Sequence, residues 1–231
     1  SVARRALEAG KHILVDFPLV TNANAAKQLF ELAKEKGVLC YEEDIALETD
    51  RYLALKKLVK QQQSSLVNAE LTMTVGMAHQ WMGDIESNGS PFHMSMDLLH
   101  AQVDLLGDLT PSSCTISHTE AGGTATAKLK TKDNGDVSIT INHVTERVRD
   151  KKFKYTFSDG STIDQTTPTP LEEVSEMTKD LPKPLFLRDL HQFVETVRGN
   201  RDNTYNQWLT VRCLEIADEL FAMSKQAKAE L

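Results

Sequence analysis

The chain has 231 residues, of which 40% are hydrophobic and 26% charged, a globular composition with enough apolar residues for a packed core. The formal net charge of −7 argues against nucleic acid as a partner, because a phosphate backbone attracts basic surfaces. No apolar run approaches the ~20 residues that span a bilayer, and the three scattered cysteines predict neither a disulfide framework nor a metal site. We therefore expect a protein of the cytoplasm without membrane contact.

The first 60 residues alternate between helices and short buried strands. Residues 1–9 have the spacing of a helix, and residues 12–16 form an apolar run typical of a strand buried on both faces. A second helix ends at Gly37 and leads to a second buried strand at residues 38–41. This order is typical of the rear part of a Rossmann-type parallel sheet in an α/β fold, where ligands bind at the carboxyl ends of the strands.

A helix at residues 49–60 precedes a change of pattern. Period-two alternation predicts strands of one mostly antiparallel sheet at residues 66–75, 137–141 and 153–157. Hairpin turns are expected at Asn134-Gly135 and Asp159-Gly160. Further helices are predicted at about residues 94–106, at residues 186–199 with one apolar face, and from about Thr204 onward. The expected architecture is thus the rear of a parallel sheet followed by an α+β domain.

Three segments resemble the Gfo/Idh/MocA oxidoreductases in the same order. Residues 8–19, EAGKHILVDFPL, are similar to the family segment EAGKHVLVEKP, whose Lys-Pro pair lies beside the nicotinamide. The aromatic residue at position 17 resembles the biliverdin reductase branch, which reads Glu-Tyr-Pro there. Residues 38–47 resemble the VLHEEHVELL of that branch, and residues 183–199 resemble its NIFLKD…FVQKLLG. The resemblance therefore covers nearly the whole chain.

The resemblance implies an oxidoreductase that uses NADPH or NADH to reduce biliverdin, a linear tetrapyrrole, to bilirubin. Hydride would reach the central methine bridge, and a proton would reach a pyrrole nitrogen. Asp16, Phe17 and Pro18 would bind the cofactor, and Phe17 would also be catalytic. Phe17 lacks the tyrosine hydroxyl of the branch, so it can stack but cannot donate a proton.

Three adjacent acids, Glu42, Glu43 and Asp44, follow the second strand. Such neighbours repel one another, which favours a functional reason for their presence. Glu42 and Glu43 are candidate proton donors, and Asp44, where the branch has histidine, is a candidate substrate ligand. The two propionates of the substrate would need basic partners, for which we name Arg147, Arg149 and Lys151. The alternative for this basic cluster is a solvated loop.

The signature D-x-x-x-H-x-x-D of sugar dehydrogenases is imperfect in this sequence. Asp97 and Asp104 keep their spacing, but His100 stands one place early, and Ala101 occupies the expected histidine position. One step on a helix turns a side chain by about 100°. We therefore expect His100 to be structural, and the departure argues against a polyol dehydrogenase with the family base.

No Gly-x-Gly-x-x-Gly occurs in the sequence, so the family fold implies roughly ninety further residues upstream, as in the first βαβ units of a dinucleotide domain. Residues 1–60 would then be the C-terminal part of a dinucleotide-binding domain, and residues 61–231 the substrate and catalytic domain. Two alternatives stay open: another sugar or polyol dehydrogenase, or a catalytically silent relative that binds a tetrapyrrole or a protein. Trp81 and Met82 are possible pocket-wall residues, and no pattern indicates an oligomeric state.

Overall fold

The computed structural model describes residues 1–76, 89–119 and 122–229. Trp81 and Met82 lie outside the described residues. The N-terminal elements are α1 (Val2–Glu8), β1 (Ile13–Val15), α2 (Ala23–Lys36), β2 (Cys40–Glu42), the 3-10 helix η1 (Ile45–Glu48) and α3 (Asp50–Gln61). The large sheet and its first helices follow as β3 (Leu66–Gly76), α5 (Pro91–Met94), α6 (Met96–Leu106), β4 (Leu109–Thr119), β5 (Gly122–Thr131), β6 (Asp136–Val144), β7 (Arg149–Phe157) and β8 (Thr162–Asp164). The chain closes with α7 (Leu171–Met177), α8 (Leu185–Val197) and α9 (Thr204–Ala229).

The small sheet confirms the predicted parallel arrangement of the N-terminal strands. β1 and β2 pair in parallel, with Ile13 opposite Cys40 and Val15 opposite Glu42. The Asn22 side chain accepts a hydrogen bond from the Ala25 backbone N–H and so caps α2, whereas Gly37 ends this helix in the left-handed conformation at φ 64°. Both strands therefore end on the same side, which brings the segments after residues 15 and 42 together.

The large sheet has six strands in the order β4-β5-β6-β3-β7-β8. β3 pairs in parallel with β6 and antiparallel with β7, so Leu71 lies between Ile139 and Phe153. The expected single sheet is confirmed, and its other neighbours are antiparallel. An irregularity between Leu66 and Asn68 breaks the predicted alternation, which leaves Val67 50% exposed.

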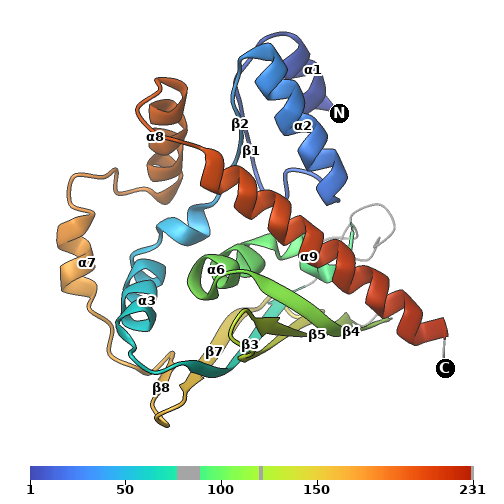
Figure 1. The fold of residues 1–231 in the computed structure, drawn as a ribbon, viewed down its shortest axis with the longest axis vertical. Coiled ribbons are helices and arrows are strands. Elements are labelled where there is room, and N and C mark those ends of the chain that lie inside the picture. Colours follow the sequence, from blue (N-terminus) through green and yellow to red (C-terminus); the bar gives the residue numbers. More distant parts are fainter. Residues whose placement is uncertain (77–88, 120–121, 230–231) are drawn as a thin grey trace.

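The inner face of this sheet packs against helices. Figure 1 shows α9 crossing the molecule between the small sheet with α1 and α2 on one side and the large sheet on the other, and α9 contacts α2, α6 and β4. The Tyr155 hydroxyl of β7 donates to Gln102 Oε1 of α6 at 3.0 Å. One buried apolar cluster includes residues of both sheets and of α9. None of the described helices is long and apolar enough to cross a membrane.

α8 forms where it was predicted, but its apolar face is largely exposed. Phe186 is 67% and Leu190 44% exposed, whereas Arg188 and Asp189 are buried. The reason is a set of polar contacts on the inner side of the helix. The Arg188 guanidinium donates to the Asp50 carboxylate at 2.7 Å and to the Glu48 backbone carbonyl at 2.9 Å. Charge-assisted bonds of this kind hold the polar face of α8 against η1 and α3.

Candidate active site

A cavity of about 790 Å³ opens between the carboxyl ends of the small sheet and the large sheet. Its walls come from the segments after β1 and β2, from α3 and α6, from β7, and from the start of α8. Of the residues named from the sequence, it brings together Asp16, Phe17, Glu43, Arg149 and Lys151. A volume of this size falls in the range of small-molecule sites.

Glu43 is the acid of the 42–44 segment that lines the cavity. Its Oε1 accepts a hydrogen bond from the Ile45 backbone N–H at 3.0 Å, and its buried Oε2 has no hydrogen-bond partner among the described residues. Burial, and then the interaction with the Asp16 carboxyl, raises the pKa of Glu43 to about 8. The cavity therefore contains a carboxylic acid that keeps its proton at neutral pH, which is the property a general acid needs.

Glu42 is fully buried and does not line the cavity. Its Oε1 accepts from the Leu19 backbone N–H at 2.6 Å, and its Oε2 accepts from the Thr210 hydroxyl at 2.5 Å. This carboxylate therefore ties the segment after β1 to α9. The expectation that it faces a substrate does not hold in this geometry, because successive side chains of an extended segment point to opposite sides and Glu43 takes the cavity side.

Asp44 also turns away from the cavity, toward His100 of α6. The Asp44 Oδ2 lies 3.2 Å from His100 Nδ1, and the Glu42 Oε2 lies 3.5 Å from His100 Nε2. The lining of the cavity on this helix is Asp97, Leu98, Ala101 and Gln102. Ala101 thus lines the cavity, whereas His100 does not.

The basic wall of the cavity comes from β7. Lys151 Nζ donates to Asp97 Oδ2 at 2.6 Å, and an Arg149 nitrogen lies 3.7 Å from the same oxygen. Arg147 lies before the strand and does not line the cavity. Pro18 likewise does not line it, although it follows Phe17 through a cis peptide bond.

Sequence reasoning missed several lining residues on α3 and β7, namely Arg51, Tyr52, Leu55, Phe153 and Tyr155. The period-two pattern of β7 carried a usable signal, because Arg149, Lys151, Phe153 and Tyr155 alternate along one strand face. Arg51 had no such signal, since it stands in the first turn of an amphipathic helix whose orientation depends on tertiary packing.

The raised pKa of Glu43 predicts that the difference in stability between wild type and Glu43→Gln depends on pH. Folding raises this pKa from an ordinary 4.5 to about 8. The contribution of Glu43 to the free energy of unfolding is therefore complete below about pH 4.5 and is lost as the pH rises through about 8. Glu43→Gln keeps a neutral side chain at every pH. We expect the melting temperature of Glu43→Gln, relative to wild type, to increase between pH 5 and pH 9. A constant difference over this range in thermal melts would contradict the protonated Glu43.

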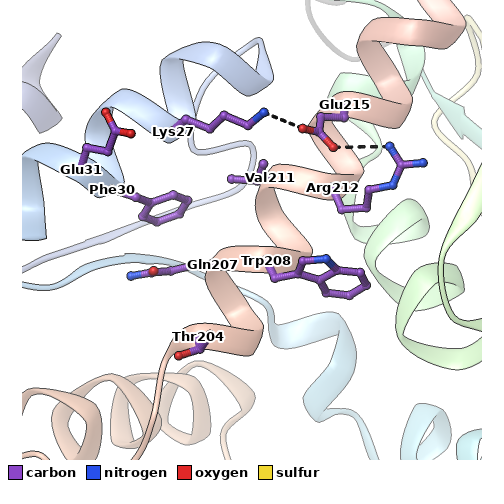
Figure 2. Close-up of a pocket in the computed structure, with 9 residues that line it drawn as sticks. All are labelled: Lys27, Phe30, Glu31, Thr204, Gln207, Trp208, Val211, Arg212 and Glu215. Atoms are coloured by element: carbon purple, nitrogen blue, oxygen red, sulfur yellow. Dashed lines mark hydrogen bonds and ion pairs between the residues drawn. The ribbon is translucent and has the colours of Figure 1, made fainter.

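A second cavity of about 400 Å³ lies between α2 and α9 (Figure 2). Lys27 contacts Glu215 at 2.6 Å, and Arg212 contacts the other oxygen of Glu215 at 3.4 Å. Phe30 and Trp208 form its apolar part. Because Glu215 pairs with both cations, this groove presents little free charge to a ligand, and we assign no chemistry to it.

The sequence model of the Gfo/Idh/MocA oxidoreductases, a family with an NAD-binding Rossmann fold, matches residues 1–43. Biliverdin reductase A of Mus musculus and that of Homo sapiens are each 27% identical over 222 residues, which is 94% of this chain and 69% of each relative.

Solved structures share the fold at lower identity. The biliverdin reductase of Synechocystis sp. PCC 6803, in complex with biliverdin and NADP+, superposes with a TM-score of 0.77 at 18% identity, covering 97% of this chain and 75% of that one. GenD2 from gentamicin A biosynthesis, in complex with NAD, superposes with a TM-score of 0.78 at 14% identity, covering 98% and 73%.

The N-terminal 43 residues thus match the sequence model of the Gfo/Idh/MocA oxidoreductases, and the chain shares its fold with solved oxidoreductases. Over nearly its whole length, the chain is similar to biliverdin reductase A of the two mammals.

Proposed function

We propose that the 790 Å³ cavity binds biliverdin and that the protein reduces it to bilirubin with NADPH or NADH. The observation that carries this proposal is Glu43, a carboxylic acid with a pKa raised to about 8 that lines the cavity beside Phe17. The similarity to two biliverdin reductases supports the choice of substrate. We further propose the domain division inferred from the sequence, with residues 1–60 on the cofactor side and residues 61–231 on the substrate side.

The segment that follows β1 has residues suited to contact the nicotinamide. Asp16 and Phe17 line the cavity at the carboxyl end of this strand, the edge at which nucleotides bind in parallel sheets. Phe17 offers an aromatic face, and Pro18 fixes the backbone after it. A bound reduced nicotinamide would supply the hydride. The role of these residues is to hold two flat molecules in contact and to exclude water between them.

The substrate side supplies cations at two walls. Arg149 and Lys151 come from β7, together with Lys152, and Arg51 comes from the start of α3. Lys151 and Arg149 already face the Asp97 carboxylate, whereas no ion pair of Arg51 occurs among the described residues. Guanidinium and ammonium groups form charge-assisted hydrogen bonds with carboxylates. We therefore add Arg51 to Arg149 and Lys151 as a partner for the two propionates.

Glu43 provides the proton that Phe17 cannot provide. Its Oε2 carries no hydrogen bond to a described residue, so it can donate to a pyrrole nitrogen of the substrate. The second candidate substrate is a sugar. Oxidation of a sugar alcohol needs a base, and Ala101 at the cavity wall has no imidazole to act as one.

The test is turnover of biliverdin by the full-length protein with each nicotinamide, monitored by absorbance. We expect loss of biliverdin and formation of bilirubin with equimolar oxidation of the nicotinamide. Binding of biliverdin without turnover by either nicotinamide would favour the silent relative. Turnover of a sugar nucleotide without turnover of biliverdin would favour the dehydrogenase.

Phe17→Tyr restores the hydroxyl of the biliverdin reductase branch. Because Glu43 already supplies a proton, the added group should contribute one hydrogen bond of about 0.5–1.5 kcal/mol, which corresponds to an increase of about twofold to tenfold in turnover. Nicotinamide affinity should stay nearly unchanged. Both quantities can be measured on one preparation. A lower turnover with an intact circular dichroism spectrum would show that position 17 serves packing alone.

A further inference from the structure

His100 is a buried histidine that the proposed chemistry does not use. It is 1% exposed, and the cavity is lined by its helix neighbours Asp97 and Ala101 rather than by its own ring. The ring lies between two carboxylates, with Nδ1 3.2 Å from Asp44 and Nε2 3.5 Å from Glu42. These two acids flank Glu43 in the sequence, and the ring therefore contacts both neighbours of the residue that lines the cavity.

The charges around this ring come from two parts of the chain. Glu42 and Asp44 face it from the end of β2, and Asp97 acts on it from its own helix. The buried Cys213 thiol of α9 interacts with the same two acids but carries no charge, because burial, followed by Asp44 and Glu42, raises its pKa. Burial alone would lower the pKa of His100, but Asp44, then Glu42 and Asp97 raise it to about 9. The ring is thus the cation that balances the buried acids.

The same acids hold the two segments that present the proposed active site. Glu42 accepts the Leu19 backbone N–H at 2.6 Å, just after Phe17 and Pro18. The Asp44 backbone N–H donates to Asp189 of α8 at 3.4 Å. Two buried carboxylates without a cation would each need water or a proton. Loss of His100 would therefore move the strand end on which Glu43 stands.

We propose that His100 is a positioning residue, which pairs with Glu42 and Asp44 and thereby keeps Glu43 dry and directed into the cavity. This inference rests on the proposed function for its kinetic readout, and it has a second readout that needs no substrate. A displacement of about 1 Å in an active site lowers the rate about 10²-fold. Because burial is the first cause of the raised Glu43 pKa, hydration of a displaced Glu43 must lower that pKa.

The experiment compares His100→Gln with His93→Gln in the full-length protein. His93 is a matched control, because it is also 1% exposed and its Nε2 lies 3.0 Å from the Asp218 carboxylate, but it does not line the cavity. In His100→Gln we expect a kcat about 10²-fold lower. The Glu43 pKa, followed by carbon-13 NMR of its carboxyl, should fall below the wild-type value of about 8. His93→Gln should change neither quantity.

A double variant separates positioning from loss of the fold. Asp44→Asn combined with His100→Gln replaces the His100–Asp44 ion pair by two amides of similar size, so Glu42 alone, rather than Glu42 and Asp44, loses its cation. We expect this protein to recover at least about tenfold of the kcat lost in His100→Gln, as the buried charge is the cause of the displacement. An unchanged or raised Glu43 pKa in folded His100→Gln would overturn the proposal, as would a double variant no faster than the single one. If wild type fails to reduce biliverdin, the proposed function fails, and the NMR titration still decides the role of His100.

Discussion

Glu43→Gln should lower the turnover of biliverdin by about 10²–10⁴-fold, the usual contribution of one general acid. The amide keeps the size of the side chain and its hydrogen bond from the Ile45 N–H, but it cannot release a proton to a pyrrole nitrogen. Single-turnover absorbance kinetics measure the chemical step directly.

The pH dependence of kcat, compared between wild type and Glu43→Gln, is a second test of the role of Glu43. Wild-type kcat should decline as the pH rises through about 8, where the Glu43 carboxyl loses its proton. Glu43→Gln should be slow and lack this decline. Glu48→Gln is a suitable control, because Glu48 lies on η1 and its side chain does not line the cavity. A Glu43→Gln enzyme as fast as Glu48→Gln would remove Glu43 from the mechanism.

Glu42→Leu should destabilise the protein by about 3–5 kcal/mol, the effect of removing one partner of a buried charged pair. The substitution leaves the Leu19 N–H and the Thr210 hydroxyl without their acceptor and the His100 ring with one carboxylate instead of two. Urea denaturation at pH 7 measures the free energy of unfolding.

The matched control for Glu42→Leu is Glu70→Leu. Glu70 is exposed on β3, and a surface change of this kind stays within about 0.5 kcal/mol. If Glu42→Leu unfolded at the same urea concentration as Glu70→Leu but had lost its activity, Glu42 would be a catalytic residue rather than a structural one.

The order of elements was predictable because local signals agree with the fold. Asn22 and Gly37 delimit α2, and Asn134 takes the positive φ of 63° that its turn requires. Alternation along β7 placed Phe153, Tyr155 and Phe157 on one strand face. Such signals act over a few residues, so one sequence is sufficient to detect them.

The inner side of α8 and the roles within the 42–44 segment were not predictable in the same way. Arg188 is buried because Asp50 and the Glu48 carbonyl, far away in the sequence, provide its partners. The sequence shows three adjacent acids, but only the packed α6 helix brings His100 between Glu42 and Asp44. Which acid lines the cavity therefore depends on a long-range contact and not on local pattern.

The central claim is hydride transfer from a reduced nicotinamide to the central methine bridge of biliverdin. Its most direct test is a reaction of the full-length protein with nicotinamide deuterated at the hydride-donating carbon, followed by NMR and mass spectrometry of the product. We expect bilirubin with one deuterium at the central bridge. Product without deuterium at that carbon, or transfer of deuterium to a sugar nucleotide and none to biliverdin, would contradict the account.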